Sequence, residues 1–142
     1  MSTKPVHIDH VGLNVADLDA QVDWYTKVFG FKTARPFEVS PIGLRGIFLV
    51  GEDGFAIELL EKQGSTRNFK ATNVAEGALN QGFGHLCYRV DDVAAMNARL
   101  LEHGATQIMP VQESPEPGVT MAYVADPEGN LIEIIDRKGT VS

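Results

Sequence analysis

The sequence predicts an α+β fold built from two tandem βαβββ modules. Three observations predict this fold: the chain has 142 residues, 44% of them apolar; strand-like and helical periodicities alternate along it; and the first half recurs in the second. A chain of this length buries enough surface to fold without a disulfide or structural metal. We therefore expect a single domain over residues 1–142, with a first module at 6–62, a linker at 63–80 and a second module at 81–137.

Two pairs of segments repeat at one fixed distance. HVGLNVADLDA begins at His10, and HLCYRVDDVAA begins at His85, 75 positions later. The same distance separates Glu58, within AIELL, from Glu133, within LIEII. We interpret this as a tandem duplication that gives each half one histidine and one glutamate at matched positions.

The first module has the pattern of a strand, a helix and three strands. Residues 6–15 alternate in polarity over much of their length and predict a strand. Asp17 is a candidate N-cap for a helix whose apolar residues follow at helical spacing, and Gly30 is expected to end that helix. Three further strands are expected near 32–38, 43–50 and 54–61.

The second module repeats this order. A strand is expected at 83–90, followed by a helix that Asp92 caps and Gly104 ends. Three strands are then expected near 105–112, 118–125 and 129–136. The segment at 63–80 is polar and rich in Gly, Ser, Thr and Asn, and a connection of this length is either a crossover linker or a lid over a ligand cavity.

Composition and charge exclude several classes of partner. Twelve basic residues against nineteen acidic ones give a net charge of −7, and the basic residues are scattered, which argues against nucleic acid. No apolar stretch approaches the roughly 20 residues that span a bilayer, and the N-terminus lacks a signal-peptide core, so no membrane partner is expected. The single cysteine, Cys87, is interpreted as a small core residue; it forms no intramolecular disulfide and favours a reducing, cytoplasmic location.

The two matched glutamates lie in strongly apolar strands. An unpaired buried carboxylate costs several kcal/mol, so Glu58 and Glu133 are either at an exposed edge or paired. Together with His10 and His85 they form the donor set that a pseudo-twofold metal site needs, although a duplication also copies structural residues. Such a mixed nitrogen and oxygen set suits one divalent cation, namely Zn²⁺, Ni²⁺, Co²⁺, Mn²⁺ or Fe²⁺.

These segments resemble the vicinal oxygen chelate superfamily, which includes glyoxalase I, methylmalonyl-CoA epimerase, extradiol dioxygenases and bleomycin-resistance proteins. The resemblance covers about residues 6–137 and rests on HIDHVGLNVADLDAQVDWYTKVFGF, AIELLE, GFGHLCYRVDD and DPEGNLIEIID. It implies that the two modules form an open curved sheet around a metal-binding cavity. The metal ligands that it implies are His10, Glu58, His85 and Glu133.

The resemblance implies a metal-dependent lyase, isomerase or epimerase. A divalent cation chelated by two neighbouring substrate oxygens stabilises an enediolate or enolate, while Glu133 or Glu58 transfers a proton beside the carbonyl. The donor set looks most like glyoxalase I, which acts on the hemithioacetal of a 2-oxoaldehyde and a thiol. However, Asn14 stands where glyoxalase I commonly has an arginine for a glutathione carboxylate, and IELLEKQGSTRNF is similar to methylmalonyl-CoA epimerase. Whether the substrate contains a thiol or CoA therefore stays open.

Two alternatives have other chemistry. In an iron(II) ring-cleaving dioxygenase, His10, His85 and Glu133 would form a facial triad, but Glu58 would fill a position that dioxygen or a catechol needs. In a metal-free sequestration protein of the bleomycin-resistance type, the metal residues are usually lacking.

Further residues are candidates for substrate contacts. Arg45 would meet a substrate carboxylate or phosphate if it points into the cavity, and is otherwise an exposed strand residue. Candidates for an apolar pocket, which core packing would explain equally well, are Phe48, Phe55, Met121 and Tyr123. The expected partner is a small molecule with neighbouring oxygen atoms. A homodimer is favoured, with the site formed within one chain or shared between two.

Overall fold

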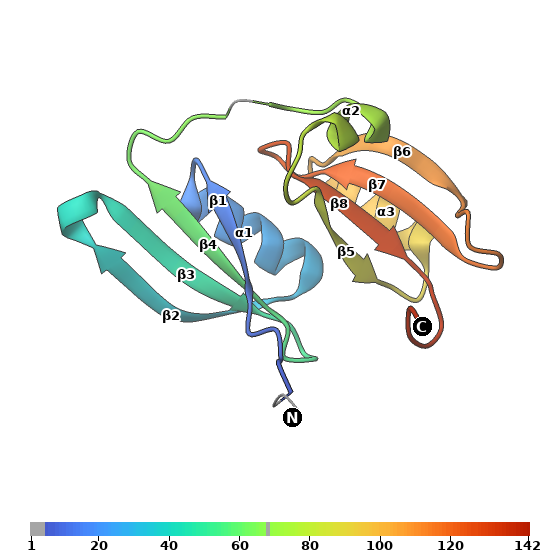
Figure 1. The fold of residues 1–142 in the computed structure, drawn as a ribbon, viewed down its shortest axis with the longest axis horizontal. Helices are drawn as coiled ribbons and strands as arrows, with labels where there is room; N and C mark the ends of the chain where they lie inside the picture. Colours follow the sequence, from blue (N-terminus) through green and yellow to red (C-terminus); the bar gives the residue numbers. More distant parts are fainter. Residues whose placement is uncertain (1–4, 68) are drawn as a thin grey trace, which may run out of the picture. The chain divides into compact units, whose positions relative to one another are not determined.

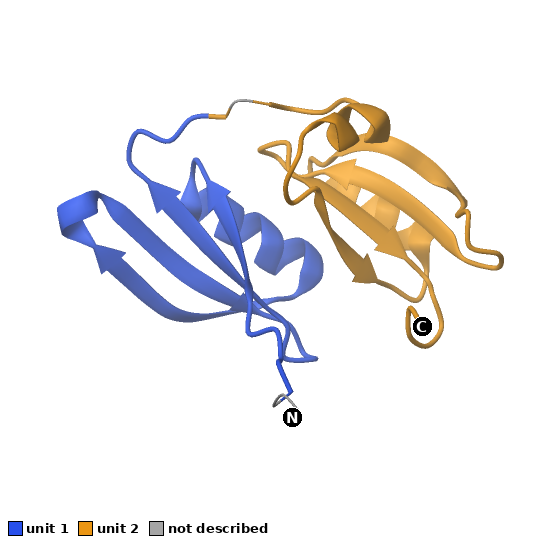
Figure 2. Ribbon diagram, in the orientation of Figure 1, with its two compact units in different colours: residues 1–66 blue, residues 67–142 orange. Residues whose placement is uncertain are grey.

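The computed structural model describes residues 5–67 and 69–142. The chain divides after Thr66 into two compact units, Met1–Thr66 and Arg67–Ser142 (Figure 2). Each unit contains one four-stranded sheet, in the order β1-β4-β3-β2 in the first and β5-β8-β7-β6 in the second. In both sheets, the first two strands of this order run parallel, and the other neighbouring strands run antiparallel. The predicted α+β class and the repeated βαβββ order are confirmed.

The first unit follows the predicted order of elements. Its elements are β1 (Val11–Val15), α1 (Leu18–Phe29), β2 (Lys32–Val39), the 3-10 helix η1 (Ser40–Ile42), β3 (Leu44–Val50) and β4 (Ala56–Lys62). Asp17 caps α1 by accepting a hydrogen bond from the Ala20 amide at 3.0 Å, and Gly30 ends the helix in the left-handed conformation with φ of 71°. Both predicted ends of this helix are confirmed.

The prediction of a strand over residues 6–15 is wrong at its start. β1 begins at Val11, which pairs with Ile57, and among the described residues β4 is the only strand beside it. Because β4 itself begins at Ala56, residues 5–9 have no neighbouring strand with which to pair in the described part of the chain. His10 therefore lies immediately before β1.

The second unit contains one element that the sequence did not indicate. Its elements are α2 (Val74–Leu79), β5 (His85–Arg89), α3 (Val93–Glu102), β6 (Thr106–Glu113), β7 (Thr120–Ala125) and β8 (Leu131–Ile135). The short helix α2 lies within the segment 63–80 and is capped by Asn73, which accepts from the Glu76 amide at 2.9 Å. None of the helices in the described part of the chain is long and apolar enough to cross a membrane.

In the first unit α1 packs against one face of the sheet, and in the second unit α3 does the same; the opposite face of each sheet does not pack against that helix (Figure 1). Leu49, Ile57 and Leu59 are completely buried, and their positions alternate with Phe48 and Glu58 along β3 and β4. The second sheet repeats this arrangement. Its most deeply buried side chains include Ala122, Val124, Ile132 and Ile134, whose positions alternate with Tyr123 and Glu133. The alternation therefore directs both glutamates away from the helix of their own unit.

A partly buried pair of amides joins α3 to β6. Asn97 is 8% exposed and donates to Gln107 Oε1 at 2.8 Å, while Gln107 Nε2 donates to Asn97 Oδ1 at 3.0 Å. Gln107 Nε2 also donates to the carbonyl oxygens of Met109 and Tyr123. The Gln107 amide therefore fixes the irregular pairing of β6 with β7 between Gln107 and Met109.

Asn97→Ala is expected to lower the free energy of unfolding by about 1–3 kcal/mol, because it leaves Gln107 Oε1 without its donor in a partly buried place. Urea unfolding followed by circular dichroism measures the change. Arg99→Ala, at an exposed position of the same helix, should change it by less than about 0.5 kcal/mol. An unfolding midpoint equal to that of the wild type in Asn97→Ala would contradict the structural role of this amide pair.

Candidate functional site

The first unit brings His10 and Glu58 together. His10 Nε2 lies 3.7 Å from Glu58 Oε1, and the Glu58 side chain is 20% exposed. On the other side of the ring, Nδ1 donates to the Asp9 carboxylate at 2.7 Å. That hydrogen bond fixes the tautomer that leaves the lone pair on Nε2, which is how carboxylates commonly orient metal-binding histidines. The edge of the imidazole contacts Phe48, with ring centroids 5.0 Å apart.

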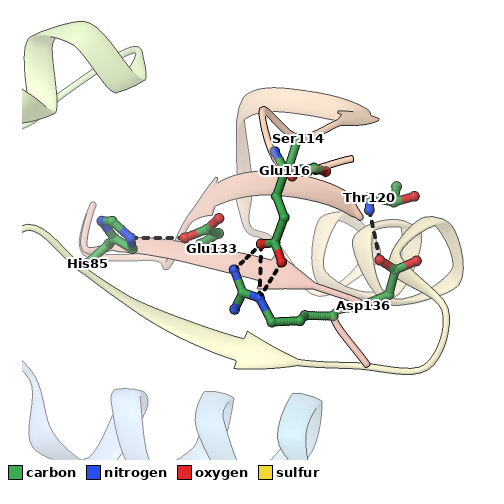
Figure 3. Close-up of polar contacts among 7 residues, drawn as sticks. His85, Ser114, Glu116, Thr120, Glu133 and Asp136 are labelled. Carbon is green, nitrogen blue, oxygen red and sulfur yellow. Dashed lines mark hydrogen bonds and ion pairs between the residues drawn. The ribbon is translucent and has the colours of Figure 1, made fainter. Parts of the chain in front are cut away.

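The second unit brings His85 and Glu133 together in the same way (Figure 3). His85 Nε2 lies 3.0 Å from Glu133 Oε2, and the Glu133 side chain is 14% exposed. Tyr123 takes the place of Phe48, with ring centroids 5.1 Å from His85, and its hydroxyl lies 3.3 Å from His85 Nε2. The duplication that the sequence predicts therefore extends to the side-chain geometry.

Register explains why the two pairs match. Glu58 is paired with Phe48 across β3 and β4, and Glu133 is paired with Tyr123 across β7 and β8. Cross-strand partners project to the same face of a sheet, so each aromatic ring stands beside its glutamate. The aromatic positions are separated by the same 75 residues as the glutamates.

The hydroxyl of Tyr123 distinguishes the second pair from the first. Burial, followed by the negative charge of Glu133, raises the pKa of Tyr123 above its usual range, so the phenol remains a hydrogen-bond donor at neutral pH. Phe48 offers no donor at the matched position. The carboxylate of Glu133 is therefore surrounded by more polar groups than that of Glu58.

Cys87 corrects an expectation from the sequence. It was predicted to be a small core residue, but it is exposed, because it pairs with Glu133 across β5 and β8 and shares the face that lacks the helix. Partial desolvation, followed by the Glu133 charge, raises the pKa of the Cys87 thiol to about 12. The thiol is therefore protonated at neutral pH and is a poor nucleophile.

Each unit supplies two candidate metal donors. Within residues 5–67 and 69–142, no group of three or more His, Cys, Asp or Glu side chains is arranged to hold a metal ion. Imidazole nitrogen and carboxylate oxygen are suitable donors for the divalent cations named above. Two donors bound at about 2.1 Å to one ion lie roughly 3.0–3.5 Å apart, close to the separations of both pairs. The donor chemistry therefore fits a divalent cation.

The candidate substrate residues occupy two different faces. Phe48 and Tyr123 belong to the two pairs described above, and Met121, two residues before Tyr123 on β7, shares its face. Arg45 lies on the helix-packed face of the first sheet, where Nε donates to Glu61 at 2.8 Å and Nη2 donates to Asp19 at 3.3 Å. The structure therefore does not bring Arg45 together with Glu58.

The ion pair of Arg45 and Glu61 makes the first unit sensitive to acid. The Arg45 guanidinium, followed by the Leu18 amide, holds the pKa of Glu61 below its usual range. A depressed carboxyl pKa contributes stability above the unfolded pKa, about 4.3, and this stability is lost as pH falls through the lower folded value.

Glu61→Gln is therefore expected to lower the melting temperature at pH 7, with a smaller difference from the wild type at about pH 3. Thermal unfolding at a series of pH values measures this. Glu52→Gln, at an exposed turn, should follow the wild type at every pH. A Glu61→Gln deficit that stays constant with pH would contradict the ion-pair explanation.

Three charged residues near Glu133 were not singled out from the sequence. Arg137 and Glu116 form an ion pair (Figure 3), and Arg89 is the last residue of β5. A signal was present, since Arg89 follows His85 by four positions and Arg137 follows Glu133 by four.

Comparison with known proteins places the chain in a family. A model of the Glyoxalase/Bleomycin resistance protein/Dioxygenase superfamily matches residues 7–134. The lactoylglutathione lyase of Escherichia coli O157:H7 is 30% identical over 135 residues, which cover 91% of each chain. The lactoylglutathione lyase of Arabidopsis thaliana is 30% identical over 138 residues, but this chain spans only 44% of that relative's length.

A solved structure agrees with these relatives. The trypanothione-dependent glyoxalase I of Leishmania major is 27% identical, with a TM-score of 0.70, and the match covers 93% of this chain and 87% of that one. The chain belongs to the glyoxalase/bleomycin resistance/dioxygenase superfamily, the vicinal oxygen chelate superfamily that its sequence resembles. Within this family, its curated relatives include proteins named lactoylglutathione lyase.

Proposed function

We propose that this chain is a divalent-metal-dependent lyase or isomerase of the glyoxalase I type, which transfers a proton at a carbon beside a carbonyl. One observation carries the proposal: each module places an imidazole nitrogen and a carboxylate oxygen 3.0–3.7 Å apart at matched positions. In both copies an aromatic ring contacts the imidazole beside its carboxylate, which supports a matched pair of donors. The names of the relatives support a lyase.

The two pairs are proposed to hold one cation, Zn²⁺, Ni²⁺, Co²⁺, Mn²⁺ or Fe²⁺, through His10, Glu58, His85 and Glu133. The pairs come either from one chain or from two copies in a homodimer. When bound, the cation would act as a Lewis acid toward two neighbouring substrate oxygens and stabilise the negative charge that develops on proton removal.

Residues of the chain itself transfer the proton, orient the imidazole and contact the apolar part of the substrate. A carboxylate of Glu58 or Glu133 accepts the proton from carbon and returns it to the neighbouring carbon, which is the role of a general base and acid. Asp9 holds the His10 ring in the tautomer that exposes the Nε2 lone pair. Phe48 and Met121 supply apolar surface for the part of the substrate that carries no charge.

Glu58 also bears on the choice among reactions. A ring-cleaving dioxygenase would use His10, His85 and Glu133 and keep the other positions for dioxygen and a catechol. The contact of Glu58 with His10 supports its role as a fourth donor, which favours proton transfer.

The test combines metal content with turnover. The purified protein, loaded with each candidate metal in turn, is supplied with hemithioacetals of methylglyoxal, racemic 2-methyl-acyl-CoA and catechols. We expect one metal per site, and solvent deuterium incorporated at a substrate carbon. Dioxygen consumption with a catechol would overturn the proposal, as would a protein that gains no metal on incubation. Light scattering reports whether the active species is a homodimer.

A further inference from the structure

Two arginines lie at the same end of the parallel pair β5 and β8. Arg89 pairs with Ile135 and follows Cys87 by two positions, so its side chain projects to the face that carries Glu133. Beyond β8, the Asp136 amide still donates to the Thr120 carbonyl, which keeps the chain extended. Because side chains alternate between the two faces along an extended chain, the Arg137 side chain lies on the same face as Glu133.

Arg137 is already arranged to bind a carboxylate. Its Nε and Nη2 groups donate to Glu116, at 3.0 Å and 2.6 Å to Oε2, in a forked contact (Figure 3). The Arg137 side chain is 19% exposed and that of Glu116 is 45% exposed, so the carboxylate is the more accessible partner. The contact leaves the Nη1 group of Arg137 for another acceptor.

Arg89 is exposed and makes no ion pair within the described residues. Both guanidinium charges act on the Cys87 thiol and oppose the rise in its pKa, which agrees with their placement beside this residue. One arginine without a counter-ion and one with a free donor group therefore flank the same part of the sheet.

We propose that Arg89 and Arg137 form an anion-binding subsite of the second module, which takes a carboxylate or phosphate group of the substrate. Guanidinium groups bind planar or tetrahedral anions through paired, charge-assisted hydrogen bonds. Glu116 acts as an internal competitor that occupies one edge of Arg137 until the ligand arrives. The matched positions of the first module are Asn14 and Lys62, so neither supplies a guanidinium. This inference rests on the proposed function, because it concerns the same substrate.

Two substrate types carry such an anion. A peptide thiol such as glutathione presents carboxylates, and a CoA thioester presents phosphates; the subsite's chemistry is common to both. Binding measurements distinguish these two substrate types without a turnover assay.

The experiment is calorimetric titration of the metal-loaded protein with S-methylglutathione, its diethyl ester and CoA. We expect S-methylglutathione or CoA to bind, and the diethyl ester, which has no carboxylate, to bind at least tenfold more weakly if the carboxylate is the recognised group. Arg89→Gln should weaken binding of the recognised anion about tenfold or more, since a charge-assisted hydrogen bond is lost. Glu116→Gln should have the opposite effect, because it removes the competing carboxylate.

The matched control is Arg99→Gln, which removes an exposed charge from α3 of the same unit and should bind like the wild type. Unchanged binding in Arg89→Gln, weaker binding in Glu116→Gln, or failure of both anions to bind the wild type would overturn the subsite. Failure of the proposed function is distinguishable, since it would abolish turnover while leaving the binding differences in place.

Discussion

Glu133→Gln is expected to lower turnover by about 10²- to 10⁴-fold, because an amide of the same shape cannot accept the proton from carbon. Glu58→Gln tests the matched glutamate in the same assay. Glutamine keeps an oxygen donor, so both variants should stay folded and retain metal. The measurement is the steady-state rate with the substrate that the panel identifies, together with circular dichroism and metal content.

The control for these variants is Glu113→Gln, which changes an exposed glutamate at the end of β6 and should leave the rate unchanged. If one glutamate variant loses turnover and the other does not, the base is assigned to the first. Glu133 has the Tyr123 ring and the Cys87 thiol beside it, whereas Phe48 and Gly12 stand beside Glu58. Full activity in both variants would exclude a proton transfer through either carboxylate.

The architecture was accessible from the sequence because its elements are locally determined. Asp17 and Gly30 bound α1 through their own side-chain and backbone preferences. Alternating polarity placed the strands of both modules, and the 75-residue offset showed that the second half repeats the first. The helix caps and the alternation require only the neighbours of each residue along the chain, and the offset requires only a comparison of the two halves.

Other features depend on partners that the linear pattern does not contain. The start of β1 is set by where β4 begins, so residues before His10 could not be excluded from the strand. Cys87 follows the alternation of an apolar strand, but only the pairing with Glu133 shows that its side faces away from the core. The position of Arg45 likewise depends on Asp19 and Glu61, which lie far from it in sequence.

The candidate site was partly predictable for the same reason. The matched positions of His10 with Glu58 and His85 with Glu133 identified two pairs that the structure brings into contact. The ion pair of Arg137 with Glu116 joins the end of β8 to the loop after β6, and no motif marks such a contact. Polar contacts between a strand end and a loop are set by the tertiary fold, and a single sequence carries little information about them.

His85→Ala is expected to weaken binding of the divalent cation by at least about a hundredfold, and His10→Ala should do the same. Loss of residues that only orient a metal-binding histidine already costs about 10- to 100-fold, so loss of the imidazole donor itself should cost no less. Titration with Co²⁺ or Zn²⁺ against a competing chelator gives the affinity, and the visible spectrum of the Co²⁺ protein reports a change in its donors.

Two other histidines provide matched controls for this measurement. His7→Ala removes an exposed imidazole three residues before His10, and His103→Ala removes the one that caps α3. Both controls should bind the cation like the wild type. If His10→Ala weakens binding and His85→Ala does not, only the first module holds the metal, and the duplicated site is excluded. Equal losses in the two variants, with a single ion bound per site in the wild type, would instead support donation by both halves to one ion, since two independent ions would leave one site intact in each variant.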